Sequence, residues 1–281
     1  MRQRHSTGGL SRRGRVTRVV GTGLVVVLVL AAVGPVLWTV GMSLKPSKAV
    51  FSGSWAFTPT TVNYSHVVSS GFVASLAHSA IIDSAATALS MALAMPAAFA
   101  VVRQRKRRAF RMMMDYNYII RLLPGLIILV PLFEVFRTLN LLNSYLGMVL
   151  AYQVVGLPVA MATMFGFFAE VPVEIDEAAI VDGATTFQVF LKVAVPLVRS
   201  GAIATAVMVF MMAWTEFLFA LILTGPQTVT APVAILNFLK YSNVDWGALA
   251  AATVFLLVPS AVFGVATSRL FVQGLTSGAV K

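Results

Sequence analysis

The side chains best suited to proton transfer, ion binding or polar recognition are the ten carboxylates of the chain. Five of them lie in one short segment: Glu170, Glu174, Asp176, Glu177 and Asp182. Two others, Asp83 and Glu216, stand inside long apolar runs. A charge within an apolar membrane segment is costly, so it is first treated as a functional hypothesis. Asp83 and Glu216 are therefore candidate pathway residues or interhelical hydrogen-bonding residues, and we favour the second interpretation.

No set of residues in the sequence has the composition of a catalytic or metal site. Cysteine is absent, which excludes disulfides, thiolate metal sites and cysteine nucleophiles, and the three histidines do not have metal-ligand spacing. The sequence contains no phosphate loop of the form Gly-x-x-x-x-Gly-Lys-Ser/Thr. It contains no Gly-x-Ser-x-Gly or His-Glu-x-x-His motif either. We therefore predict a chain that is not an enzyme and that binds no metal or cofactor itself.

The elements that position these carboxylates are predicted to be membrane-spanning helices. The chain is 58% apolar and 11% charged, against about 45–50% and roughly 25% in a soluble domain. A bilayer core about 30 Å thick needs ~20 residues of apolar helix. We expect an all-α polytopic membrane protein with one six-helix domain over residues 19–271, whose spans are 19–40, 73–102, 119–136, 145–168, 202–223 and 248–271. The first run is longer than the roughly 7–15 residues of a signal-peptide core, so we expect an uncleaved span.

The positions of the charged residues predict how this topology is oriented across the membrane. The net charge of +11 comes largely from basic residues in the first 18 positions and in the tract 103–111. Short basic stretches beside apolar spans are typical of cytoplasmic loops, so we do not expect nucleic-acid binding. With six spans, the N-terminus (1–18), the segment 170–199 and the C-terminal tail (272–281) all fall in the cytoplasm. We predict a multi-pass protein of a bacterial plasma (inner) membrane, surrounded by its lipid.

The acidic segment 170–199 is predicted to lie outside the bilayer as a helix, a turn and a second helix. Pro172 suits a first helical turn, and the acidic residues that follow suit the positive end of the helix dipole. Gly183 can end the first helix and permit a turn. Ala178 and Ala179 allow another surface to approach closely. The residues alone fit both an ordinary loop helix resting on the bundle and a surface that another protein grips.

The spacing within this segment resembles a known signature. Glu177-Ala178-Ala179, three residues, Gly183, nine residues and then 193–196, which end in Pro196, resemble the EAA motif of ABC importer permeases. Valine replaces the usual isoleucine and leucine near the end of that motif. The stretch 214–220 and the C-terminal residues 269–281 are similar to those of carbohydrate permeases related to the maltose importer, so the resemblance covers nearly the whole chain.

The resemblance implies a role for the acidic segment. In this family it is a coupling helix that docks in a cleft of a cytoplasmic ATPase. The implied coupling residues are Asp176, Glu177, Ala178, Ala179, Asp182, Gly183 and Pro196. The implied partners are a homologous second permease, two ABC ATPase subunits that hold ATP-Mg, and an extracytoplasmic solute-binding protein. The chain would form half of the pathway for a sugar or a related polar solute.

Two alternatives stay open at this stage. An ion-coupled carrier or channel could use Asp83 and Glu216 as proton or cation sites, although it would not need an ATPase-docking segment at 170–199. The solute could also be a polyol, an amino sugar or a glycerol phosphate ester, because the sequence does not name it.

Overall fold

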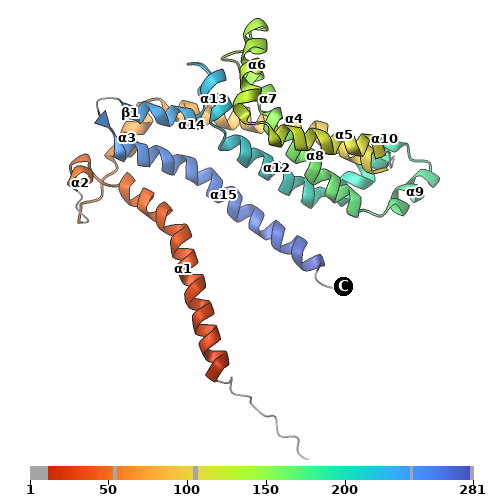
Figure 1. Cartoon of the computed structure of the whole chain (residues 1–281), viewed down its shortest axis with the longest axis horizontal. Helices are drawn as coiled ribbons and strands as arrows, with labels where there is room; N and C mark the ends of the chain where they lie inside the picture. The colour runs from red at the N-terminus through yellow and green to blue at the C-terminus, as the bar shows by residue number, and fades with distance from the viewer. Residues whose placement is uncertain (1–11, 53–55, 104–106, 241–242, 279–281) are drawn as a thin grey trace, which may run out of the picture.

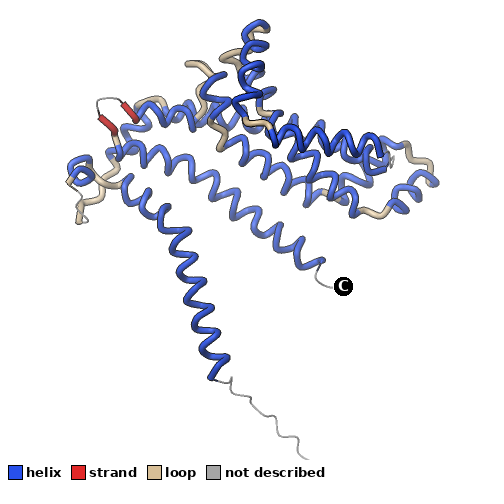
Figure 2. Tube along the Cα trace, viewed as in Figure 1, coloured by secondary structure: helices blue, strands red, loops and turns tan. Residues whose placement is uncertain are grey.

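The computed structural model describes residues 12–52, 56–103, 107–240 and 243–278, and helices make up most of them. The tails 1–11 and 279–281, parts of the predicted cytoplasmic termini, lie outside this range. Figure 2 shows helix throughout, apart from loops and one short strand pair. In that pair β1 (Leu239–Lys240) runs antiparallel to β2 (Asn243–Val244), with Leu239 opposite Val244. No pattern in the sequence predicts this strand pair, but the predicted all-α membrane class is confirmed.

Four helices form the body of the bundle and run along one another in Figure 1. They are α4 (Phe72–Arg103), α8 (Gln153–Glu170), α12 (Arg199–Trp214) and α15 (Trp246–Gly278). The most extensive contact is between α4 and α8, and α12 packs against both. Prolines occur inside α4, α8 and α15. Membrane helices tolerate such prolines because neighbouring groups can satisfy the freed carbonyls.

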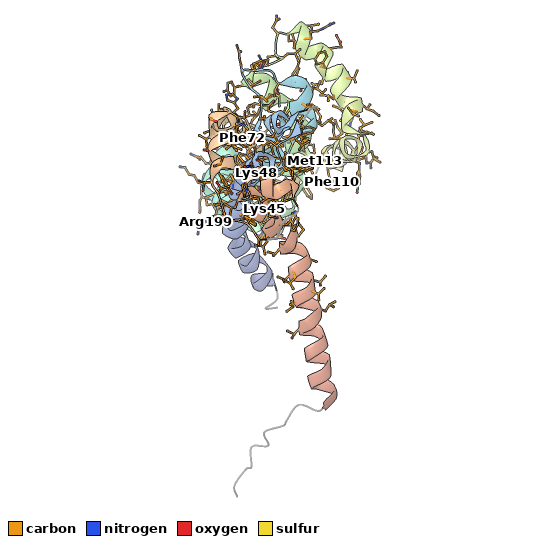
Figure 3. The ribbon with its side chains drawn as sticks, turned by 90° about the vertical axis from the view of Figure 1, so that its left-hand side faces the viewer. Lys45, Lys48, Phe72, Phe110, Met113 and Arg199 are labelled. Atoms are coloured by element: carbon orange, nitrogen blue, oxygen red, sulfur yellow. The ribbon has the colours of Figure 1, made fainter. Side chains whose placement is uncertain are left out.

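Helix α1 (Arg12–Ser43) stands away from this bundle. It meets α15 near the end where Lys45 and Lys48 lie, and the rest diverges in both Figure 1 and Figure 3. The most apolar window within Gly21–Ser43 is long enough to cross a membrane and contains no buried residue. The side chains of this span therefore face lipid or another chain.

Three of the predicted spans are interrupted. The run 119–136 is divided between α5 (Arg107–Leu122) and α6 (Gly125–Thr138), which meet at 98°. Pro124 causes this break, because a proline disfavours helical geometry in the residue before it and lacks a backbone N–H. The run 145–168 has a junction between α7 (Tyr145–Ala151) and α8, and 202–223 is broken between α12 and α13 (Leu218–Leu223).

The number of spans depends on how the bent helices are counted. The described residues include four helices that can cross a membrane alone, and up to six if each bent pair is one span. One bent pair is α5 with α6. The other joins 186–197 to α12 at an angle of 79°.

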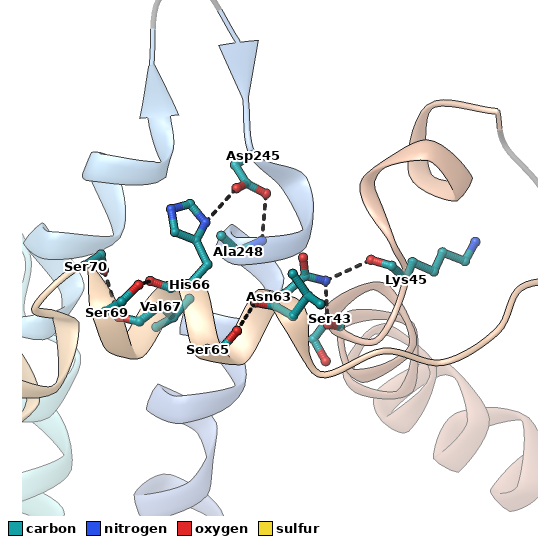
Figure 4. Close-up of polar contacts among 11 residues, drawn as sticks. Ser43, Lys45, Asn63, Ser65, His66, Val67, Ser69, Ser70, Asp245 and Ala248 are labelled. Atoms are coloured by element: carbon teal, nitrogen blue, oxygen red, sulfur yellow. Dashed lines mark hydrogen bonds and ion pairs between the residues drawn. The ribbon is translucent and has the colours of Figure 1, made fainter.

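One end of the bundle, called here the hairpin end, carries the strand pair and the folded loop 44–71. Its short helices are α2 (Ser47–Phe51), α3 (Val62–Ser69), α14 (Ala231–Ala234) and the 3₁₀-helix η2 (Ile235–Phe238). Figure 4 shows the polar contacts that hold this end together. Buried Asn63 donates through Nδ2 to the carbonyls of Ser43 and Lys45, both at 2.8 Å. His66 Nδ1 lies 3.1 Å from Asp245 Oδ2, so the loop is tied to both α1 and α15.

The opposite end, called here the α9 end, carries α9 (Val173–Val181) and α10 (Thr186–Gln188). These are followed by the π-helix η1 (Val189–Ala194) and by α11 (Val195–Leu197). A cluster of buried apolar side chains lies beneath them: Ala98, Phe99, Met164, Phe168, Val189, Ala194 and Val198. This cluster fixes the segment 186–198 on α4 and α8.

Candidate functional site

Helix α9 has well-defined ends. Pro172, with extended backbone angles (φ −56°, ψ 135°), occupies the N-cap position, and Glu174 and Asp176 fall in the first turn. At the other end Gly183 has φ +90°, a conformation that glycine adopts without strain. The N–H groups of Gly183 and Ala184 donate to the carbonyls of Ile180 and Ala179, both at 3.0 Å. These two bonds form the Schellman motif that closes many helices, so Gly183 sets the turn that the sequence predicted.

The second part of the segment starts with its own cap. The Thr185 hydroxyl accepts from the Gln188 N–H at 3.3 Å, and the Gln188 side chain accepts from the Thr185 N–H at 2.9 Å. This reciprocal pair is a capping box. From Val189 onward the chain is anchored in the apolar cluster beneath the α9 end. The turn between α9 and α10 is therefore fixed on both sides.

The predicted coupling residues do not all face the same way. Glu177, Ala178, Asp182, Gly183 and Pro196 are exposed, whereas Ala179 is half-buried. Large apolar side chains are exposed beside them: Val181 is 87% exposed and Phe187 is 69% exposed. We call Glu177, Ile180, Val181, Asp182 and Phe187 the α9 surface. Its mixture of apolar and acidic groups outside the bundle is suited to contact with another protein.

Asp176 differs from the other predicted coupling residues, because it is only 4% exposed and faces the bundle. Its carboxylate forms an ion pair with the Nε atom of Arg103, the last residue of α4. The sequence indicated Arg103 only as one of the basic residues that set the topology. Nothing in the sequence linked it to residue 176, because the two are far apart along the chain.

Glu216 caps a helix. Its Oε1 accepts from the N–H groups of Leu218 (3.0 Å) and Phe219 (3.2 Å), and its Oε2 accepts from Phe219 (3.0 Å) and Ala220 (3.3 Å). These are the unsatisfied donors at the start of α13, and the carboxylate also meets the positive end of the helix dipole. The break between α12 and α13 thus gives this half-buried charge a set of local partners.

Asp83 lies on α4 and is 1% exposed. Among the described residues, neither of its carboxylate oxygens has a hydrogen-bond partner. It is close enough to Glu216 for the two charges to interact, so the structure brings both candidates into one region. Tyr152 and Thr230 lie in the same region, and neither of their buried hydroxyl groups has a hydrogen-bond partner among the described residues. The sequence did not single out Tyr152 or Thr230, since an isolated tyrosine in a span and an isolated threonine between two spans carry no signal.

The described residues contain no group of three or more histidine, aspartate or glutamate side chains that could hold a metal ion.

Comparison with known proteins identifies the family. Residues 86–275 match the family described as the binding-protein-dependent transport system inner membrane component. The trehalose transport system permease protein SugB of Mycobacterium tuberculosis is 37% identical over 254 residues, which cover 88% of this chain and 92% of the relative. The diacetylchitobiose uptake system permease protein DasC of Streptomyces coelicolor is 29% identical over 261 residues, covering 91% and 94%.

A solved structure shares the fold. A chain of a bacterial ABC transporter involved in the import of the acidic polysaccharide alginate superposes with a TM-score of 0.80 at 20% identity. The match covers 94% of this chain and 99% of that chain. This chain belongs to the inner-membrane components of binding-protein-dependent transport systems and is a permease subunit of an ABC importer.

Proposed function

We propose that this permease forms half of a carbohydrate pathway and that its α9 surface docks on a cytoplasmic ATPase. The observation that carries the proposal is the combination of fixed ends and an exposed face in α9. The Schellman turn at Gly183 and the capping box at Thr185 hold the element rigid. Val181 and Phe187 stay exposed beside Glu177. A rigid protrusion can transmit a partner's movement to the spans as rigid-body motion.

The proposed solute class is a carbohydrate of about disaccharide size. Two of the relatives described above are named for trehalose and for diacetylchitobiose. Both are neutral solutes rich in hydroxyl groups, and diacetylchitobiose also carries two amide groups. A polyol, an amino sugar or a glycerol phosphate ester would need different polar partners, and we treat them as alternative results of the solute test.

The proposed assembly contains a second permease, two ATPases that bind ATP-Mg and an external solute-binding protein. In this proposal the chain itself is not catalytic and binds no cofactor. The α9 end and both termini lie in the cytoplasm, and the hairpin end faces outward. Support comes from the basic residues that flank the apolar runs. We do not propose the ion-coupled carrier or channel, because the family match is to importer permeases.

The test is to purify the importer from its native membrane through a tag on this chain and to reconstitute it in vesicles. ATPase activity and uptake are then measured with the solute-binding protein and a panel of trehalose, maltose, diacetylchitobiose, an amino sugar, a polyol and a glycerol phosphate ester. We expect ATPase stimulation and uptake with one of the carbohydrates. Stimulation by the amino sugar, the polyol or the phosphate ester alone would overturn the solute class.

The docking part of the proposal needs its own variant. Val181→Glu places a charge on the most exposed apolar side chain of α9 without touching the buried face. We expect it to weaken ATPase recovery on the tagged permease. Leu24→Ser, on the exposed face of α1, is the matched control and should leave ATPase recovery unchanged. Equal ATPase recovery with Val181→Glu and with the parent would contradict docking through this surface.

A further inference from the structure

Arg103 makes three kinds of contact at the junction of α4, α8 and α9. Its Nε atom pairs with the Asp176 carboxylate on α9. Its Nη1 donates to the carbonyl of Val171, the C-cap residue of α8, at 3.0 Å. Its guanidinium carbon lies 5.7 Å from the centre of the Phe99 ring on α4. One side chain therefore ties together the end of α4, the end of α8 and the buried face of α9.

Arg103 is much less exposed to solvent than the basic residues near it in the sequence. Its side chain is 13% exposed and that of Asp176 is 6% exposed, whereas Arg108 and Arg111 on α5 are exposed. Exposed ion pairs contribute little, but removing one partner of a buried pair leaves an uncompensated charge. A planar guanidinium can serve a carboxylate and a carbonyl together, which the single ammonium of lysine does less well. Arg103 therefore contacts both α9 and the end of α8, in addition to its predicted part in setting the topology.

The direction of the contact matters for coupling. Asp176 faces the bundle, while its neighbour Glu177 and the nearby Val181 belong to the exposed α9 surface. A force applied to the exposed face reaches the bundle through the buried face of the same short helix. Helix α4 receives it at Arg103, and α4 packs along both α8 and α12.

We propose that Arg103 is a positioning residue that clamps the coupling helix to α4 and thereby transmits the ATPase movement to the spans. This inference rests on the proposed docking of α9. In this proposal Asp176 belongs to the buried face of α9 as the partner of Arg103, and it does not contact the ATPase.

A purely structural role would have a different signature from a clamp. Loss of a fold-stabilising pair lowers the amount and thermal stability of the assembled importer, but each assembled molecule still moves the normal amount of solute per ATP. Loss of a clamp lowers solute moved per ATP in molecules that still assemble and still hydrolyse ATP. The decisive readout is this coupling ratio in reconstituted importer, normalised to assembled protein.

The test uses Arg103→Lys, Asp176→Asn and the exchanged pair Arg103→Asp with Asp176→Arg. Arg108→Gln, which removes an exposed charge from the same tract, is the control. We expect the first two to lower the coupling ratio about tenfold, which corresponds to ~1.4 kcal/mol, with ATPase subunits still bound. The exchanged pair should recover part of the ratio, and the control should match the parent. Unchanged coupling ratios in Arg103→Lys and Asp176→Asn would overturn the clamp.

A second measurement covers variants that assemble poorly. The chain has no cysteine, so Arg103→Cys with Asp176→Cys can be joined by a short reversible thiol crosslinker without background from this subunit. A pocket of about 470 Å³, lined by Arg103, Val171 and Glu174 among others, gives the reagent access to position 103. We expect the unlinked double variant to be uncoupled, linking to restore coupling and cleavage of the linker to abolish it. Equal coupling before and after linking would reject the clamp, while a parent importer without ATPase coupling would reject the proposed function itself.

Discussion

At the scale of single residues, the three carboxylates within the bundle have different surroundings. Glu216 accepts four hydrogen bonds from three backbone N–H groups at the start of α13. Asp176 pairs with Arg103, whereas neither oxygen of Asp83 has a hydrogen-bond partner among the described residues. A buried charge is stable only when such partners compensate for the lost water. The role of each carboxylate therefore follows from its partners and not from its position in an apolar run.

The cap on α13 makes a prediction for Glu216. Glu216→Ala removes every side-chain acceptor from the first N–H groups of α13, and loss of a cap costs about 0.5–2 kcal/mol. We expect a lower thermal midpoint for the purified importer, followed by tryptophan fluorescence, and an unchanged order of preference among solutes. Glu216→Gln, which keeps one acceptor oxygen, should fall between the two. A change in solute preference with an unchanged midpoint would instead make Glu216 a pathway residue.

Asp83 gives a second prediction at this scale. Asp83→Asn keeps the shape of the side chain and removes its ability to carry charge. Since no described group pairs with the carboxylate, we expect uptake and assembly to stay within about twofold of the parent, a change below ~0.5 kcal/mol. Uptake of labelled solute into vesicles measures this. Loss of uptake in fully assembled importer would show that the charge of Asp83 takes part in transport.

At the scale of elements, a short helix is defined by how its ends are closed. Helix α9 has only nine residues, too few to be stable alone in water. Pro172, the turn at Gly183 and the ion pair of Asp176 hold it in place. The same principle holds for α13, which has six residues and depends on Glu216.

Gly183 tests this dependence. Its φ of +90° strains any residue with a Cβ, at a cost of about 1–2 kcal/mol, although no neighbouring atom would clash with the added group. We expect Gly183→Ala to weaken stimulation of the ATPase by loaded binding protein, and Gly183→Asn to be milder because asparagine tolerates this conformation. Gly166→Ala, in the interior of α8 with open space around it, is the matched control. Full stimulation in Gly183→Ala would mean that the turn is not needed for coupling.

At the scale of the whole molecule, the two ends of the bundle lie on opposite sides of the membrane in our proposal. The absence of cysteine allows a direct measurement with single cysteines. Val62→Cys, at the hairpin end, and Val181→Cys, at the α9 end, replace side chains that are 66% and 87% exposed. We expect a membrane-impermeant thiol reagent to label the first in intact cells and the second only after permeabilisation.

The cysteine-free parent is the control for background labelling. Because a docked ATPase would cover Val181→Cys, labelling is repeated on permease expressed without its partners. Labelling of both positions from the same side would contradict the six-span topology, and labelling of Val181→Cys in intact cells would reverse its direction.

The sequence by itself determined the class of this protein and the positions where some of its helices begin and end. An apolar fraction of 58% leaves lipid as the only surroundings for so much hydrophobic surface, and Pro172 and Gly183 mark helix ends through local backbone geometry. These features depend on neighbouring residues or on composition, so a single sequence contains them. The predicted docking role of the coupling residues is still a prediction.

Only the tertiary structure decided which distant groups meet. The pairing of Arg103 with Asp176, the grouping of Asp83 with Tyr152 and Thr230, and the right-angled break before α6 all involve positions that no local pattern connects or orients. Such contacts depend on how helices pack in three dimensions. The spacing of apolar residues predicts which face of a helix is buried, but it does not predict which other helix packs against that face. For the same reason the resemblance could only name Asp176 among the coupling residues, and the fold shows that this carboxylate faces inward to Arg103 at the end of α4.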